Sequence, residues 1–298
     1  MYGPGAASLG LPEPTPKPRR KGQLRRGLYV LPSLFTVGTL VCGYYAVLST
    51  LRGAQIFASG MGSDQALQLA MQAFDGAAKA IAYAVLFDAL DGRIARLTNS
   101  SSDFGREFDS LADVVSFGVA PAFLAFAWGV RPVEEVAGTQ LVQHLRDLGW
   151  VVTFAFVICG AARLARFNIQ TNRPQSDRRY FVGLPIPAAA GLVGAVVHWA
   201  KYPVNDWRYG LVWLGIMGVL AFLMVSRMRY FSFKTLDLHR PRSYLLIIVL
   251  GLIIYLVVTF SEYMLLTLAL TYVLSGPIAR LTSRLRPHSP APKEVHAA

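Results

Sequence analysis

The chain has 298 residues, of which 54% are hydrophobic and only 15% are charged, and its mean hydropathy is +0.42. This composition is too apolar for an ordinary soluble domain and indicates a protein embedded in a membrane. The formal net charge of +12 at pH 7 is explained by basic loops and attraction to anionic lipids. Nucleic acid is excluded as a partner, because no soluble domain is evident that could offer a groove.

The hydropathy pattern predicts an all-α, polytopic membrane protein in three parts. Residues 1–26 are Gly- and Pro-rich and then basic, so we expect a disordered N-terminal segment. Residues 27–284 form one membrane domain, and residues 285–298 form a disordered tail. A hydrocarbon core about 30 Å thick needs about 20 helical residues to cross it. Eight spans are expected, at Leu28–Leu51, Leu69–Leu97, Gly105–Val130, Gly149–Ile169, Val182–Ala200, Arg208–Ser226, Tyr244–Thr259 and Tyr263–Leu281.

The loops between these spans differ strongly in basic residues. Of the 29 Lys and Arg residues, the loops on one side contain only Arg52, Arg131, Arg146, Lys201 and Arg208, and Lys79 lies inside a span. All the others fall on the opposite side, which the positive-inside rule makes cytoplasmic. Both termini are therefore expected in the cytoplasm, with the protein in the cell membrane (the inner membrane of a bacterium).

Lys79 has an acidic neighbour one helical turn away in the second span. Asp75 and Lys79 are four residues apart, the spacing at which opposite charges on a helix meet. We expect a local ion pair here rather than a second functional site.

Four further aspartates stand at regular spacing in the second and third spans. Asp88 and Asp91 are three residues apart, and Asp109 and Asp113 are four apart, so each pair lies on one helix face. Two helices can therefore direct all four carboxylates into one cleft on the cytoplasmic side. Such acids are costly at membrane depth and repel one another, so we expect bound cations. Ligands that are all oxygen favour Mg²⁺ or Mn²⁺ over Zn²⁺; the alternative is a pair of buried structural carboxylate–arginine networks.

The residues around these acids suit a phosphate-containing ligand. Gly92 and Gly105 leave room for a ligand close to the backbone, and Arg96 offers a planar fork that matches a phosphate. The whole stretch resembles the signature of the CDP-alcohol phosphatidyltransferase family, D-x2-D-G-x2-A-R-x8-G-x3-D-x3-D, at every defined position.

This resemblance implies a role for each position of the signature. Asp88, Asp91, Asp109 and Asp113 would hold two metal ions, and Asp113 would also be the base that accepts a proton from the acceptor alcohol. Gly92, Ala95, Arg96 and Gly105 would face the CDP moiety. The family also implies a homodimer.

Three further runs are similar to the phosphatidylserine synthase branch of the family: residues 110–122 (SLADVVSFGVAPA), 163–168 (RLARFN) and 181–188 (FVGLPIPA). The branch implies transfer of the phosphatidyl group of CDP-diacylglycerol to L-serine, giving phosphatidylserine and CMP by metal-assisted in-line attack. Arg163, Arg166 and Asn168 would bind the serine carboxylate or the lipid phosphate. Their alternative role is that of interface anchors.

Two other functions stay open on the sequence alone. The acceptor could be glycerol 3-phosphate or an inositol phosphate, because Arg163 and Arg166 suit a phosphorylated alcohol equally well. A non-enzymatic transporter could also use intramembrane acids, although ion coordination would not require the surrounding glycines and arginine. The first span departs from the family pattern in part: many members carry Pro-Asn-x-x-Thr-x-x-Asn there, whereas this chain has Ser33 and Thr39 at the two Asn positions and keeps Pro32 and Thr36.

Overall fold

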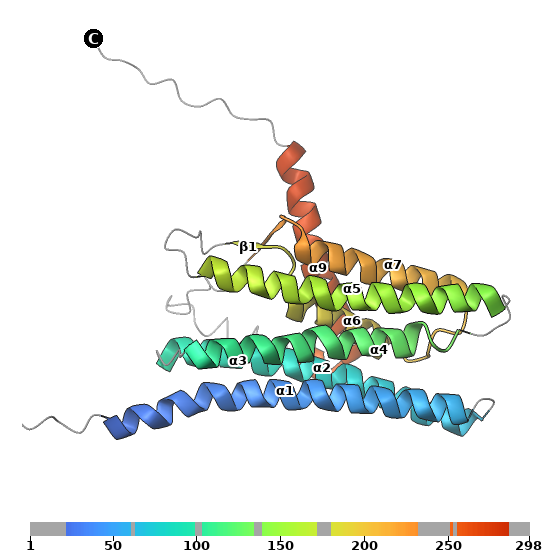
Figure 1. Cartoon of the computed structure of the whole chain (residues 1–298), viewed down its shortest axis with the longest axis horizontal. Coiled ribbons are helices and arrows are strands. Elements are labelled where there is room, and N and C mark those ends of the chain that lie inside the picture. The colour runs from blue at the N-terminus through green and yellow to red at the C-terminus, as the bar shows by residue number, and fades with distance from the viewer. Residues whose placement is uncertain are drawn as a thin grey trace, which may run out of the picture.

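The computed structural model describes residues 22–60, 63–98, 103–133, 139–171, 180–231, 251–252 and 255–285. Most of them lie in long helices that run side by side, while the end of the last helix projects beyond the others (Figure 1). The elements are α1 (Gly22–Ser59), α2 (Asp64–Thr98), α3 (Asp103–Asp113), η1 (Val114–Val119), α4 (Ala120–Gly129), α5 (Thr139–Thr171), β1 (Tyr180–Val182), α6 (Ile186–Ala200), α7 (Trp207–Val225), β2 (Arg229–Phe231) and α9 (Ser261–Leu285).

The helical class predicted from the sequence is confirmed, with one small addition. Two three-residue strands, β1 and β2, pair antiparallel with Tyr180 opposite Phe231. They form where the loop after α5 meets the end of α7, and no sequence pattern indicated them.

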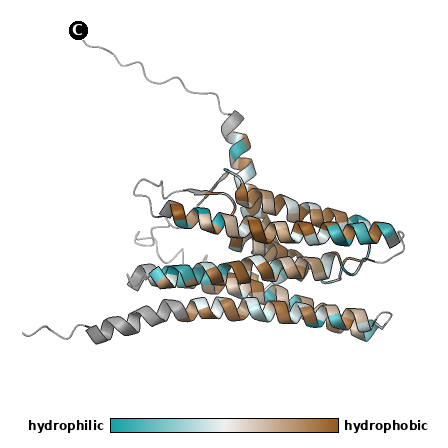
Figure 2. Cartoon of the chain, viewed as in Figure 1, coloured by the Kyte–Doolittle hydropathy of each residue, from teal (hydrophilic) through white to brown (hydrophobic). Residues whose placement is uncertain are grey.

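Five helical segments of the described chain are long and apolar enough to cross a membrane: Leu34–Ser59, Asp103–Gly129, Gln140–Ile169, Trp207–Val225 and Ser261–Thr282. Figure 2 shows apolar residues along most of their length, with hydrophilic residues gathered at the starts of α3 and α5. Helix α6 is apolar but shorter, and α2 is long but carries several charged residues. The predicted span Tyr244–Thr259 lies mostly outside the described residues. Its described parts, 251–252 and 255–259, are helical.

Small residues allow α2 to pack closely against its neighbours. Ala70, Phe74, Ala77, Ile81 and Ala84 recur at helical spacing and are all fully buried. Alanine at such positions lets helix backbones approach, and van der Waals packing holds helices together where lipid is as apolar as the side chains. The buried face of α2 contacts α1 and α6, which fixes the orientation of the acids near its C-terminal end.

A π-helical segment interrupts the third span immediately after Asp113. The predicted span Gly105–Val130 consists of α3, η1 and α4 in direct succession, and η1 has the wider π geometry. Pro121 follows in the first turn of α4, where its missing N–H removes one regular hydrogen bond. Gly43 of α1 lies against η1, since a Cβ there would stand 2.4 Å from Ser116 Oγ. Ser116 in turn donates a hydrogen bond to the carbonyl oxygen of Thr39 at 2.9 Å.

A separate polar cluster joins α2, α6 and α9, with its α2 residues about midway along that helix. His198 of α6 is 4% exposed; its Nδ1 contacts Asp75 of α2, and its Nε2 lies 2.9 Å from Ser261 Oγ of α9. Lys79 Nζ lies 2.8 Å from the other Asp75 oxygen, so the predicted ion pair is confirmed. We call Asp75, Lys79, His198 and Ser261 the histidine cluster.

Candidate active site

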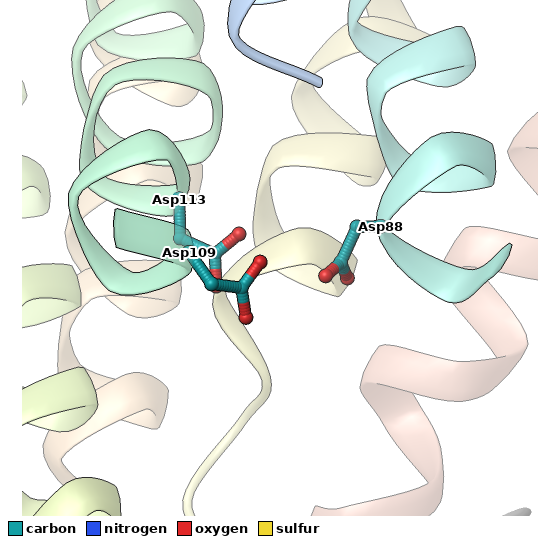
Figure 3. Close-up of side chains that lie close together, drawn as sticks. All are labelled: Asp88, Asp109 and Asp113. Atoms are coloured by element: carbon teal, nitrogen blue, oxygen red, sulfur yellow. The ribbon is translucent and has the colours of Figure 1, made fainter. Parts of the chain in front are cut away.

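The structure brings three of the four predicted acids together. Asp88 comes from α2, and Asp109 and Asp113 come from α3; one oxygen of each lies within 4.8 Å of the others. Figure 3 shows the two α3 carboxylates facing Asp88 across the gap between the helices. The spacing of four residues puts Asp109 and Asp113 on one face of α3. We call these three residues the aspartate cluster.

Nothing in the described part of the chain neutralises the aspartate cluster by direct contact. No ion pair within the described residues includes any of its three carboxylates. Asp113 is only 8% exposed, and its Oδ1 has no hydrogen-bond partner among those residues. Because like charges this close destabilise one another, and buried charges need partners, the site suits a cation. The donors are all carboxylate oxygens, with neither His nor Cys in the group, which fits Mg²⁺ or Mn²⁺.

Asp91 stands apart from the group of three, although it lies one turn beyond Asp88 on α2. It is 6% exposed and accepts a hydrogen bond from the hydroxyl of Thr36 on α1. Thr36 is the position of the first span that matches the Thr of the family pattern, between the departures at Ser33 and Thr39. Sequence spacing gave no sign of the Thr36–Asp91 contact, because the two residues are 55 positions apart.

The structure describes the predicted nucleotide-facing positions only in part. A Cβ added at Gly92 would meet no atom within 4 Å, so open space lies beside this residue. Gly105 lies one turn before Asp109 on α3. Ala95 and Arg96 belong to the last part of α2, but their side chains lie outside the described residues.

The three polar residues near the end of α5 have different surroundings. Arg163 is 8% exposed, and its Nε has no hydrogen-bond partner in the described part of the chain. Its positive charge acts on Asp113 and on Tyr272 of α9. Arg166 Nη1 donates to the carbonyl oxygen of Val225 at 3.1 Å, at the C-terminus of α7, where helix carbonyls lack partners. Asn168 Nδ2 donates to Ser110 Oγ at 2.9 Å, which ties α5 to the residue after Asp109.

Residues 29–224 match the sequence profile of the CDP-alcohol phosphatidyltransferases. The chain belongs to that family. The resemblance predicted from the aspartate spacing is thereby confirmed, and the aspartate cluster lies within the matched region.

Several relatives share the name CDP-diacylglycerol–serine O-phosphatidyltransferase. The protein of Helicobacter pylori strain J99 is 37% identical over 227 residues, which cover 76% of this chain and 82% of the relative. The protein of Bacillus subtilis is 31% identical over 204 residues, or 68% of this chain and 91% of the relative. The protein of Saccharomyces cerevisiae is 47% identical over 112 residues, covering 36% of each chain.

Thr36 and Ser110 are polar contacts of the site that the sequence did not single out for a role. Thr36 holds Asp91, and Ser110 accepts the hydrogen bond of Asn168 while donating to the carbonyl oxygen of Arg106 at 3.0 Å. Thr36 lies in the stretch of the first span that departs in part from the family pattern. Ser110 begins the first of the three branch runs, residues 110–122. Each has a role that depends on contact with another helix, which spacing within one helix does not reveal.

Proposed function

We propose that this membrane protein transfers the phosphatidyl group of CDP-diacylglycerol to the hydroxyl of L-serine, giving phosphatidylserine and CMP. The observation that carries the proposal is the aspartate cluster, built from the complete family signature in a chain whose relatives bear the name of this reaction. Binding metal cations requires negatively charged ligands. This requirement explains why an enzyme of this class keeps carboxylates at membrane depth despite their cost.

We assign the metal site to Asp88, Asp109 and Asp113, with Asp91 as the adjacent fourth acid, and we propose two ions of Mg²⁺ or Mn²⁺. The unpartnered Oδ1 of Asp113 and the all-oxygen donor set support this assignment. When bound, the cations supply positive charge for the pyrophosphate and for the charge that develops on the leaving CMP phosphate.

The protein's own groups then position the two substrates. Asp113 accepts the proton of the serine hydroxyl, and the serine oxygen attacks the lipid-linked phosphorus in line as the bond to the CMP oxygen breaks. Gly92, Ala95, Arg96 and Gly105 face the CDP. Arg163 binds the serine carboxylate or the lipid phosphate, because its buried guanidinium keeps an unused donor near Asp113. Arg166 and Asn168 position the end of α5 through their contacts with Val225 and Ser110.

In the proposed orientation the aspartate cluster lies at the cytoplasmic face, where nucleotides are available. This orientation follows from the distribution of Lys and Arg in the loops and requires eight spans with both termini in the cytoplasm. We also propose a homodimer in the cell membrane. Protease added to intact cells should leave tags at residues 1 and 298 uncut. Cleavage of either tag from outside would show that the span count is wrong.

A comparison of acceptors tests the reaction itself. Purified protein in mixed micelles with CDP-diacylglycerol and divalent metal is supplied with L-serine, glycerol 3-phosphate or an inositol phosphate at equal concentration, and CMP release is measured. Serine should support release, with phosphatidylserine as the lipid product. Release with a phosphorylated alcohol but not with serine would overturn the substrate while keeping the reaction class, and no release with any alcohol would overturn both.

A further inference from the structure

The end of the bundle remote from the aspartate cluster contains a cavity of about 940 Å³. It lies between the end of α1, the start of α2, the end of α4 and the start of α5. Along α1, the lining residue Phe57 is about 30 Å from Thr36 beside the metal site, at 1.5 Å per helical residue. The cavity is therefore separate from the site of phosphatidyl transfer, and its volume falls in the range of small-molecule pockets.

The cavity has an apolar wall and a polar wall. Ala54, Phe57, Leu67 and Phe126 are among the apolar residues that line it. Such a surface accommodates hydrocarbon, and Ala54, Phe57 and Phe126 belong to two of the segments that are long and apolar enough to cross the bilayer, Leu34–Ser59 and Asp103–Gly129. A ligand that fills this cavity therefore has an acyl portion as well as a polar one.

The polar wall offers groups of both charge signs. Arg131, Arg146 and Asp64 line the same cavity, together with Asn205. No ion pair within the described residues includes any of these three charged groups, and the buried Nε of Arg146 has no hydrogen-bond partner there. Guanidinium groups match a phosphate, while a carboxylate matches an ammonium group.

We propose that this cavity binds one aminophospholipid molecule, with its phosphate at Arg131 and Arg146, its ammonium group at Asp64 and its acyl chains along the apolar wall. A purely anionic lipid would leave the Asp64 carboxylate without a partner and close to a second negative charge. A free phosphate ion would leave the apolar wall empty. The occupant that uses all three features carries phosphate, ammonium and hydrocarbon together.

Binding is measured by native mass spectrometry of the full-length protein in detergent, with phosphatidylethanolamine as the probe. Phosphatidylglycerol, phosphatidylcholine and inorganic phosphate serve as comparison ligands. The wild type should retain phosphatidylethanolamine in preference to the other three. The doubly substituted Arg131→Gln/Arg146→Gln protein should retain it about tenfold less well or worse, as expected when charge-assisted hydrogen bonds to phosphate are lost. The Asp64→Asn variant should lose the preference over phosphatidylglycerol while still binding lipid.

Two further variants separate this site from general lipid adhesion and from misfolding. Arg208→Gln removes a charge on the same side of the membrane, where Arg208 stacks on Trp207 outside the cavity, and should retain the probe as the wild type does. Ala58→Trp places a bulky side chain in the cavity at a lining residue and changes no charge. Like the double arginine variant, it should retain less of the probe than the wild type. Equal retention by the wild type, the double variant and Ala58→Trp would overturn the proposal, and so would equal retention of all lipids by the wild type. If inorganic phosphate bound as strongly as lipid, the cavity would be an anion site that does not recognise lipid, contrary to the proposal.

Discussion

The aspartate cluster and the histidine cluster both place carboxylates between helices of an apolar bundle, yet their surroundings differ in one respect. Asp75 has a lysine at 2.8 Å and a histidine in hydrogen-bond contact, and that histidine is itself held by Ser261. The three acids of the aspartate cluster have no ion pair in the described part of the chain, and one Asp113 oxygen has no hydrogen-bond partner there. A carboxylate whose partners are present stabilises the fold, whereas a group of acids without partners needs a ligand to complete it.

Metal removal gives the largest expected difference between the two clusters. Chelation should abolish CMP release, because Asp88, Asp109 and Asp113 then face one another without positive charge, and Mg²⁺ or Mn²⁺ should restore it. The histidine cluster already contains a cationic partner for Asp75, Lys79, and should not respond. Turnover that persists in excess chelator would contradict the assignment of the aspartate cluster as a metal site.

The Asp113→Asn substitution tests the role of one acid within the aspartate cluster. Turnover should fall about 10²–10⁴-fold, the usual cost of losing a general base, while most CDP-diacylglycerol binding remains. The matched control is Asp103→Asn on the same helix, because Asp103 is exposed and its ion pair among the described residues is with Arg106 at 2.9 Å. CMP release and substrate binding are measured for both. Loss of binding in Asp113→Asn would show that Asp113 is chiefly a metal ligand, and near-normal turnover would exclude both roles.

Arg163 and Arg166, near the end of α5, extend the comparison between unpartnered and partnered groups. Arg163→Lys should raise the apparent KM for serine or for the lipid by about tenfold, because lysine cannot reproduce a bidentate contact. Arg166→Lys should leave KM near the wild-type value, since its described contact is to the carbonyl oxygen of Val225. Initial rates at varied serine and CDP-diacylglycerol concentrations separate these outcomes. A larger KM change in Arg166→Lys than in Arg163→Lys would reverse the assignment.

Breaking the histidine cluster should have the smallest effect on chemistry. His198→Ala leaves Asp75 and Ser261 without their buried partner and should lower the free energy of unfolding by about 1–3 kcal/mol. Turnover per folded molecule should stay at the wild-type level. The apparent Tm from tryptophan fluorescence and the rate of CMP release are compared with those of His144→Ala, which alters an exposed histidine on α5. A large loss of turnover without a change in Tm would show that the cluster takes part in catalysis.

Features set by spacing within one helix could be predicted from the sequence. The faces shared by Asp109 with Asp113 and by Asp75 with Lys79 follow from intervals of four residues, and the ion pair of the second set is present. The apolar runs likewise indicated the helical membrane class. In each case the information lies within about one helical turn or one span, where the geometry of the helix fixes the outcome.

Contacts between distant helices could not be predicted in the same way. The interaction of His198 with Asp75 spans 123 positions and that of Thr36 with Asp91 spans 55, so no periodicity connects the partners. That Thr36 contact gives Asp91 a partner that Asp88, Asp109 and Asp113 do not share in the described part of the chain. The π-helical segment η1 was also missed; Pro121 follows it in the first turn of α4, and Gly43 of the distant helix α1 packs against it.

The direct succession of α3, η1 and α4 has a consequence for the lipid environment. This single rod joins Asp113 to Gly129, a distance of about 24 Å at the usual helical rise, and a hydrocarbon core is about 30 Å thick. The length of this helical segment therefore sets the depth of the carboxylates relative to the far side of the bilayer. A thicker or thinner membrane forces such a rod to tilt or the lipid to deform, so acyl-chain length should influence how well the headgroup pyrophosphate of a lipid substrate reaches the acids.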